Sequence, residues 1–201
     1  MSFKIAVALD QTGHMVQAPI KPLTLAEFLA QPETKPASEY INGIVTQKPM
    51  PQGKYSLIQR ELSLALTLAF RVTKAAQAFP ELRSTFGDRS TVPDIAVFKT
   101  ERIPRDENGD IANAFELHPD WTIEILSPQQ SPSRVMRNIL HCLDYGTELG
   151  WLIDPAEACI FVYSADKSIA IFDQDEQVLP VPSFAENIEL TIGEIFGWLK
   201  G

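Results

Sequence analysis

Short apolar runs separated by helical patterns constrain the fold of this chain most strongly. Apolar residues, Leu64 and Leu68 among them, recur at spacings of three and four between residues 53 and 74, which predicts a long helix packed on a sheet, and a second helix is expected over about 133–145. Runs of strand length occur at 81–86, 92–98, 121–126 and 150–153. The order of helix, three strands, helix and strand predicts an α/β domain with a mixed, partly parallel central sheet flanked by helices.

Two pairs of strands are joined by turn residues. Asn42-Gly43 tolerates the positive φ angles of a two-residue turn, which predicts a hairpin between 38–41 and 44–47. Strands at 160–163 and 169–172 predict a second hairpin through Asp166-Lys167. These segments are expected to add strands at the borders of the central sheet.

The two ends of the chain carry weaker patterns. Gly13, Pro19 and Pro22 interrupt any regular structure before Thr24-Leu25-Ala26-Glu27, which has the form of a capping box and predicts a helix at about 25–29. Thr191 opens a short C-terminal helix. We therefore expect an N-terminal arm over 1–22 and, because 201 residues suffice for one sizeable core, one domain over 23–201.

Composition excludes some classes of protein. A net charge of −9 argues against a protein that coats nucleic acid without specificity, although it says little about one local cleft. Cys142 and Cys159 share no metal or redox spacing, so a reducing, cytoplasmic setting is expected. The apolar run at 3–9 is too short to span a bilayer, which predicts no membrane role.

Single carboxylates interrupt two of the apolar runs. By strand alternation Asp94 shares a face with Val92, Ala96 and Phe98, and Glu124 shares one with Thr122 and Leu126. An unpaired carboxylate in such surroundings is costly, so two on neighbouring strands suggest one shared cation such as Mg²⁺ or Mn²⁺. The carbonyl of Ile125 would suit the same ion. The alternative, that each carboxylate caps a strand end or forms an ion pair, stays open from the pattern alone.

Four motifs, in order and spacing, resemble a known family. They are Glu39-Tyr40-Ile41-Asn42-Gly43, Pro93-Asp94-Ile95-Ala96-Val97, Ile123-Glu124-Ile125-Leu126-Ser127-Pro128 and Gly150-Trp151-Leu152-Ile153-Asp154-Pro155. Together they resemble a large bacterial family of restriction-endonuclease-like proteins, abundant in cyanobacteria and long classed as a domain of unknown function, within the PD-(D/E)XK superfamily. The resemblance covers roughly residues 24 to 199 and implies a restriction-endonuclease-like fold.

The resemblance also implies roles for acidic residues. Asp94 and Glu124 correspond to the metal ligands, and Glu39 on the first hairpin is expected to assist as a third acidic group. Glu61 on the long helix is an alternative third group, because the superfamily often places a glutamate there, although an exposed helix glutamate is the commoner case.

Two positions depart from the family pattern. The superfamily lysine would stand at Leu126, and the family lysine on the following helix aligns with Asn138, so Arg137 beside it is expected to stabilise the phosphate charge. Tyr55 stands where the family usually has histidine. A tyrosine there can still form a hydrogen bond, but it lacks the proton chemistry of histidine.

These observations lead to two hypotheses. The first is a Mg²⁺-dependent or Mn²⁺-dependent DNA endonuclease that acts as a homodimer, since folds of this kind commonly use one copy per strand. The second is a catalytically impaired module that binds nucleic acid or a protein partner. The loop 106–110 opens like a calcium loop but lacks its glycine and closing glutamate, and His141 is expected to pack on its helix.

Overall fold

The computed structural model describes residues 7–9, 15–17, 22–128 and 130–200, which form two main sheets. The larger sheet has the strand order β12-β11-β10-β9-β8-β5 and the smaller has the order β4-β3-β7-β6. The larger sheet contains β5 (Ala76–Pro80), β8 (Ile95–Lys99), β9 (Trp121–Ile125), β10 (Leu149–Asp154), β11 (Cys159–Ser164) and β12 (Ile169–Phe172). The smaller contains β3 (Ser38–Ile41), β4 (Ile44–Gln47), β6 (Ser84–Phe86) and β7 (Arg89–Thr91).

The larger sheet is mixed, as the sequence predicts. Strands β9 and β10 are parallel, and every other neighbouring pair in this sheet is antiparallel. The parallel pair requires a crossover, which α3 (Pro132–Asp144) supplies. The predicted fold class, a central mixed sheet flanked by helices, is confirmed.

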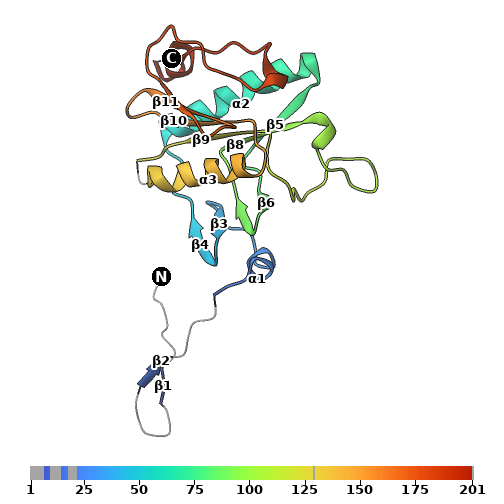
Figure 1. Ribbon diagram of the computed structural model, residues 1–201, viewed down its shortest axis with the longest axis vertical. Helices are drawn as coiled ribbons and strands as arrows, with labels where there is room; N and C mark the ends of the chain where they lie inside the picture. The colour runs from blue at the N-terminus through green and yellow to red at the C-terminus, as the bar shows by residue number, and fades with distance from the viewer. Residues whose placement is uncertain (1–6, 10–14, 18–21, 129, 201) are drawn as a thin grey trace.

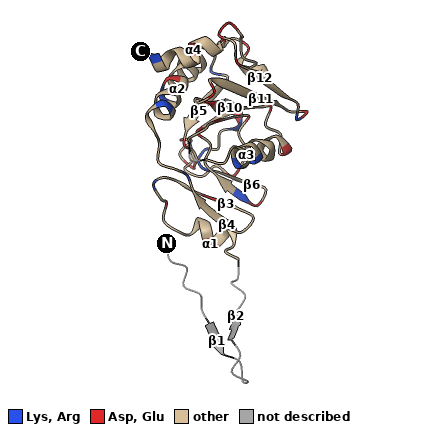
Figure 2. Ribbon diagram, turned by 90° about the vertical axis from the view of Figure 1, so that its left-hand side faces the viewer, with Lys and Arg blue, Asp and Glu red and all other residues tan. Residues whose placement is uncertain are grey.

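Helices cover both faces of the larger sheet. Helix α2 (Gly53–Thr73) and the short α4 (Ile192–Gly197) pack on one face, where Ile58, Leu62 and Leu66 join a core centred on Trp121 and Trp151. Helix α3 covers the opposite face through a smaller apolar cluster. In Figures 1 and 2 the smaller sheet lies below the larger one, on the side of α1.

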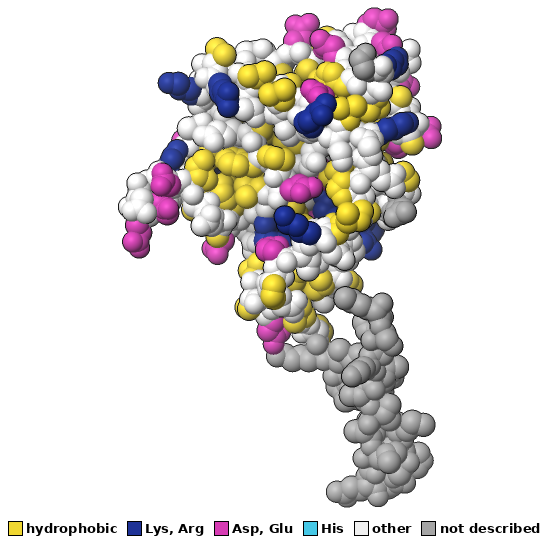
Figure 3. All heavy atoms as spheres, turned by 180° about the vertical axis from the view of Figure 1, so that it is seen from behind, with side chains coloured by type: hydrophobic (Ala, Val, Ile, Leu, Met, Phe, Trp, Pro, Cys, Tyr) yellow, Lys and Arg dark blue, Asp and Glu magenta, His cyan; other side chains and the backbone are white. Residues whose placement is uncertain are grey.

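The predicted length of α2 is confirmed, but its buried face differs in part from the expected one. Leu64 and Leu68 were expected to pack on the sheet, and both are about half exposed. Leu66 and Phe70 are buried in their place, because they continue the row that begins at Ile58 and Leu62. Apolar side chains accordingly show in patches at the surface of the molecule (Figure 3).

Two predicted strand boundaries are wrong. The strand expected at 81–86 begins only at Ser84, as β6 of the smaller sheet, and β5, which ends at Pro80 in the larger sheet, is not among the predicted strands. The run at 92–98 becomes strand only at Ile95, because Pro93 has no N–H to donate to a sheet. The link between β7 and β8 therefore passes from one sheet to the other, and it carries Asp94.

The predicted hairpins and first capping box are confirmed. Asn42 and Gly43 both have positive φ, at 51° and 82°, and join β3 to β4. β11 and β12 form the second hairpin. Thr24 caps α1 (Leu25–Leu29) reciprocally with Glu27.

The N-terminal arm lies largely outside the described residues. Within it, β1 (Val7–Leu9) pairs with β2 (Met15–Gln17), and the division at residue 22 stays a prediction. In the part of the chain that the structure describes, no helix is long and apolar enough to cross a membrane.

Candidate active site

Asp94 and Glu124 meet where the two sheets adjoin. Strands β8 and β9 pair antiparallel with Ile95 opposite Ile123, and the same register continued by one residue brings Asp94 opposite Glu124. Both side chains are buried, Asp94 completely. The sequence-predicted pair is thus brought together at one end of adjacent strands, as expected.

Asp94 is held from three directions. Its Oδ2 accepts a hydrogen bond from the amide of Ile125 at 2.6 Å, and its Oδ1 accepts one from the hydroxyl of Tyr55 at 2.5 Å. Gln59 on α2 donates to the Asp94 carbonyl at 3.0 Å. Burial and the nearby charge of Asp94 raise the pKa of Tyr55, so its hydroxyl stays a donor. Tyr55 therefore fixes the carboxylate although it cannot shuttle protons as a histidine would.

Lys48 lies between the two carboxylates, and the sequence did not reveal it. Its Nζ contacts Asp94 Oδ1, lies 3.6 Å from Glu124 Oε2 and donates to the Val92 carbonyl at 2.8 Å. Burial alone lowers the pKa of Lys48, but Asp94 and Glu124 outweigh it and raise that pKa well above its usual value. The lysine is therefore a largely buried ammonium that both carboxylates share.

Glu39 reaches the same place from the smaller sheet. Its Oε1 accepts a hydrogen bond from the Val92 amide at 3.0 Å, and its Oε2 accepts a longer one from Asn138 Nδ2 at 3.4 Å. Asn138, at the position where the family lysine aligns, is buried on α3, and its Oδ1 is a buried atom without a hydrogen-bond partner. Glu39 thus links the smaller sheet to α3 beside the two predicted ligands.

Negative charge exceeds positive charge in this cluster. Glu39, Asp94 and Glu124 are buried carboxylates, and the largely buried Lys48 contacts Asp94 and Glu124, so three charges against one leave a formal excess of two negative charges. Burial, together with the neighbouring Asp94 and Glu39, raises the pKa of Glu124 despite the attraction of Lys48. The metal-free cluster is therefore short of positive charge.

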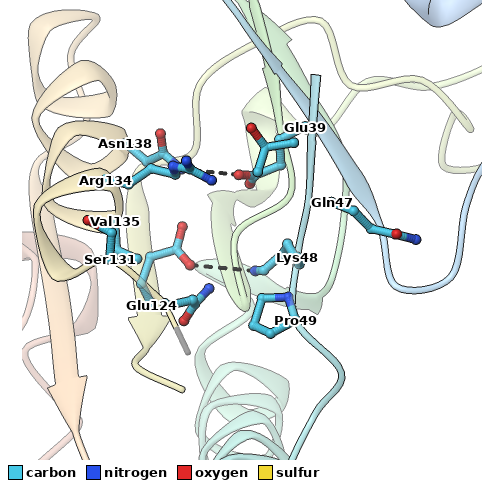
Figure 4. A pocket seen from close by; sticks show the side chains of 11 residues that line it. Glu39, Gln47, Lys48, Pro49, Glu124, Ser131, Arg134, Val135 and Asn138 are labelled. Carbon is cyan, nitrogen blue, oxygen red and sulfur yellow. Dashed lines mark hydrogen bonds and ion pairs between the residues drawn. The ribbon is translucent and has the colours of Figure 1, made fainter. Parts of the chain in front are cut away.

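A cleft of about 260 Å³ opens onto the cluster (Figure 4). Glu39 and Lys48 form one wall, Glu124 lies at its base, and Arg134 and Asn138 of α3 form the other wall. The remaining lining residues are Thr46, Gln47, Pro49, Gln130, Ser131 and Val135. A ligand in this cleft would contact the acidic cluster on one side and Arg134 on the other.

Other candidates lie outside the cleft. Arg137 is exposed on α3 and is not among the lining residues, whereas Arg134, three residues earlier, is one of them. Glu61 pairs with Arg60 at 2.5 Å at the helix surface. His141 stacks on Phe86 with ring centroids 4.9 Å apart, and its packing role is as expected. Arg134 is thus better placed than Arg137 to meet an anion in the cleft.

The donors present fit one hard divalent cation. Within the described ranges no group of three or more His, Cys, Asp or Glu side chains has a metal-binding arrangement. Mg²⁺ nevertheless needs only one or two carboxylates, because it keeps several of its waters. Asp94 Oδ1 and Glu124 Oε2 already converge on one cation, the Lys48 ammonium, so a metal ion there would take over contacts that Lys48 now makes.

A helix-flanked mixed sheet with an acidic pair at the end of adjacent strands defines a restriction-endonuclease-like fold. Residues 25–193 match the family Uma2, described as "Putative restriction endonuclease", and the chain belongs to this family. It is similar to a crystal structure from Anabaena variabilis, described as a putative nuclease belonging to DUF820. The two share 57% sequence identity over 89% of this chain and 99% of that chain, with a TM-score of 0.87. No curated protein matches the chain.

Proposed function

We propose that this protein is a divalent-metal-dependent endonuclease that hydrolyses phosphodiester bonds in DNA. The observation that carries the proposal is the excess of buried negative charge beside a cleft, three carboxylates against one ammonium. Such an excess is costly in a metal-free protein and becomes favourable once a divalent cation balances it. Membership of the Uma2 family and the likeness to a nuclease-like structure support the nuclease class.

Asp94 and Glu124 would hold the ion, which is Mg²⁺ or Mn²⁺ by the hardness of its oxygen donors. The Ile125 carbonyl is a proposed third donor, and the Ile125 amide already fixes Asp94 Oδ2 at 2.6 Å. A bound divalent ion lowers the pKa of its water and offsets the charge of the phosphate. In the hydrolysis, the oxygen of water bonds to phosphorus, the bond to the leaving oxygen breaks, and the leaving oxygen gains a proton.

Other residues of this chain position the reacting groups. The hydroxyl of Tyr55 holds the Asp94 carboxylate in place. Glu39 accepts a hydrogen bond from the Val92 amide, two residues before Asp94. Arg134 and Arg137 on α3 would bind the phosphate backbone, Arg134 from within the cleft and Arg137 from the exposed surface of the helix. Cleavage of both strands calls for two such clefts, so we propose a homodimer that acts on cytoplasmic DNA.

The test compares wild type with an Asp94→Ala/Glu124→Ala variant by calorimetric titration of Mn²⁺ and by cleavage of supercoiled plasmid. Wild type should bind the ion and nick the plasmid, and the variant should do neither. The matched control is Asp106→Ala/Asp110→Ala, which removes the same charge from an exposed loop. Ion binding lost in the loop variant and kept in the cleft variant would disprove the proposed metal site.

A second candidate function is a nucleic-acid-binding module without catalysis. The observation that favours it is the uncharged Asn138 on the cleft wall, at the position where the family lysine aligns. This candidate predicts plasmid binding that shifts electrophoretic mobility but leaves the plasmid intact with Mg²⁺ or Mn²⁺. Metal-dependent nicking that Asp94→Ala abolishes would exclude it.

A further inference from the structure

Lys48 reaches the cleft from the smaller sheet. It follows β4 directly, its side chain is 11% exposed, and its Nζ points across the cleft toward Glu124 (Figure 4). The carbonyl of Val92 accepts one of its hydrogen bonds, and Asp94 accepts another. A lysine with these contacts is held at the boundary between the buried carboxylates and the open cleft.

A largely buried lysine is a costly residue for such a position. Apolar residues of similar volume often replace buried ion pairs with no loss of stability, or with a gain. Here, moreover, one ammonium leaves most of the carboxylate charge unbalanced, so Lys48 does not complete a neutral structural pair. Its position is better explained by a charged ligand than by packing.

A phosphodiester in this cleft would meet strong repulsion without nearby cations. The cationic side chains among the lining residues are Lys48 on one wall and Arg134 on the other. If Asp94 and Glu124 held a divalent ion, the Lys48 ammonium would be released from them and its N–H groups would become available to an anion. An ammonium beside a phosphate that gains negative charge during hydrolysis lowers the barrier, because the charge is met in a water-poor site.

We propose that Lys48 is a catalytic residue that leaves the carboxylates when the metal binds and then donates hydrogen bonds to the non-bridging oxygens of the scissile phosphate. The inference rests on the proposed nuclease function. Lys48 transfers no proton in this role, and the bonds made and broken are those of the hydrolysis given above. On the other wall, α3 presents the uncharged Asn138 to the same cleft.

The experiment measures Mn²⁺ affinity and plasmid cleavage of Lys48→Met. Cleavage should fall by about 100-fold or more, the usual effect of removing one transition-state donor. Mn²⁺ should bind at least as tightly as to wild type, because the variant has lost a competitor for the carboxylates. The matched control is Lys54→Met, which removes the same charge from an exposed lysine in the first turn of α2; its cleavage should change only a few-fold.

A further variant moves the charge to the opposite wall. Lys48→Met/Asn138→Lys should recover at least about tenfold of the lost rate, because residue 138 lines the same cleft. Undiminished cleavage by Lys48→Met would overturn the inference. So would a parallel loss of metal binding and thermal stability in Lys48→Met, since Lys48 would then only hold the carboxylates in place. A wild type that binds Mn²⁺ and cleaves nothing would instead refute the proposed function, and the role of Lys48 with it.

Discussion

Two buried aspartates occupy opposite ends of the β8–β9 pair and have opposite charge environments. Asp120 precedes β9, and its carboxylate accepts hydrogen bonds from the Lys99 amide at 2.8 Å and from Arg102 at 2.6 Å. Asp94 precedes β8 and shares Lys48 with Glu124. One carboxylate thus meets one guanidinium at the first end, whereas three carboxylates meet one ammonium at the other.

The difference separates a structural aspartate from a functional one. At Asp120 every partner needed to bury the carboxylate comes from the chain itself, so the site is complete and has no use for a ligand. At Asp94 the hydrogen bonds are also made, but the charge is not balanced. Burial and hydrogen bonding therefore look alike at the two ends, and only the count of charges distinguishes them.

The largest effect on stability is expected at the balanced end. Asp120→Ala removes the partner of Arg102 and leaves the Lys99 amide without an acceptor, which should lower the free energy of unfolding by roughly 1.5–3 kcal/mol. Urea denaturation measures this change. Mn²⁺ affinity and plasmid cleavage of the folded variant should match wild type. A stable Asp120→Ala that has lost cleavage would show that charge balance does not separate the two ends.

A smaller effect of the opposite sign is expected at the other end. Glu124→Gln keeps the shape of the side chain and removes one unbalanced charge, while Lys48 keeps its contact with Asp94. The metal-free variant should be more stable than wild type by roughly 0.5–2 kcal/mol, a gain typical of substitutions that relieve strain at a functional site. Urea denaturation in the presence of a chelator measures it. A clear loss of stability would mean that Glu124 is a structural residue.

The sequence predicted the layers of the fold and the acidic pair because both depend on local pattern. Alternation placed Asp94 and Glu124 on apolar runs, and the mixed sheet follows from the order of helices and strands. Lys48 could not be found in this way, since it lies 46 residues from Asp94 in sequence and meets it only through the packing of two sheets. The second sheet itself was missed because β6 and β7 have three residues each, mostly polar, and give no strand pattern of their own.

The smallest effect is the dependence of that stability difference on pH. Burial raises the pKa of Glu124 above its ordinary value of 4.5, so the unfolded chain releases the proton at a lower pH than the folded one. Well below pH 4.5 the carboxyl is protonated in both states, and wild type and Glu124→Gln should have similar stability. As pH rises past 4.5 the cost of ionising Glu124 in the fold accumulates in wild type alone, so the advantage of Glu124→Gln should grow until the folded pKa is passed. Urea denaturation from pH 4 to 8 with a chelator measures this trend.

Saturating Mg²⁺ should reverse the stability advantage of Glu124→Gln, because an ion that binds only the folded wild type adds stability by mass action. An advantage that is the same at every pH, or that Mg²⁺ leaves unchanged, would place its origin in packing and not in the unbalanced charge.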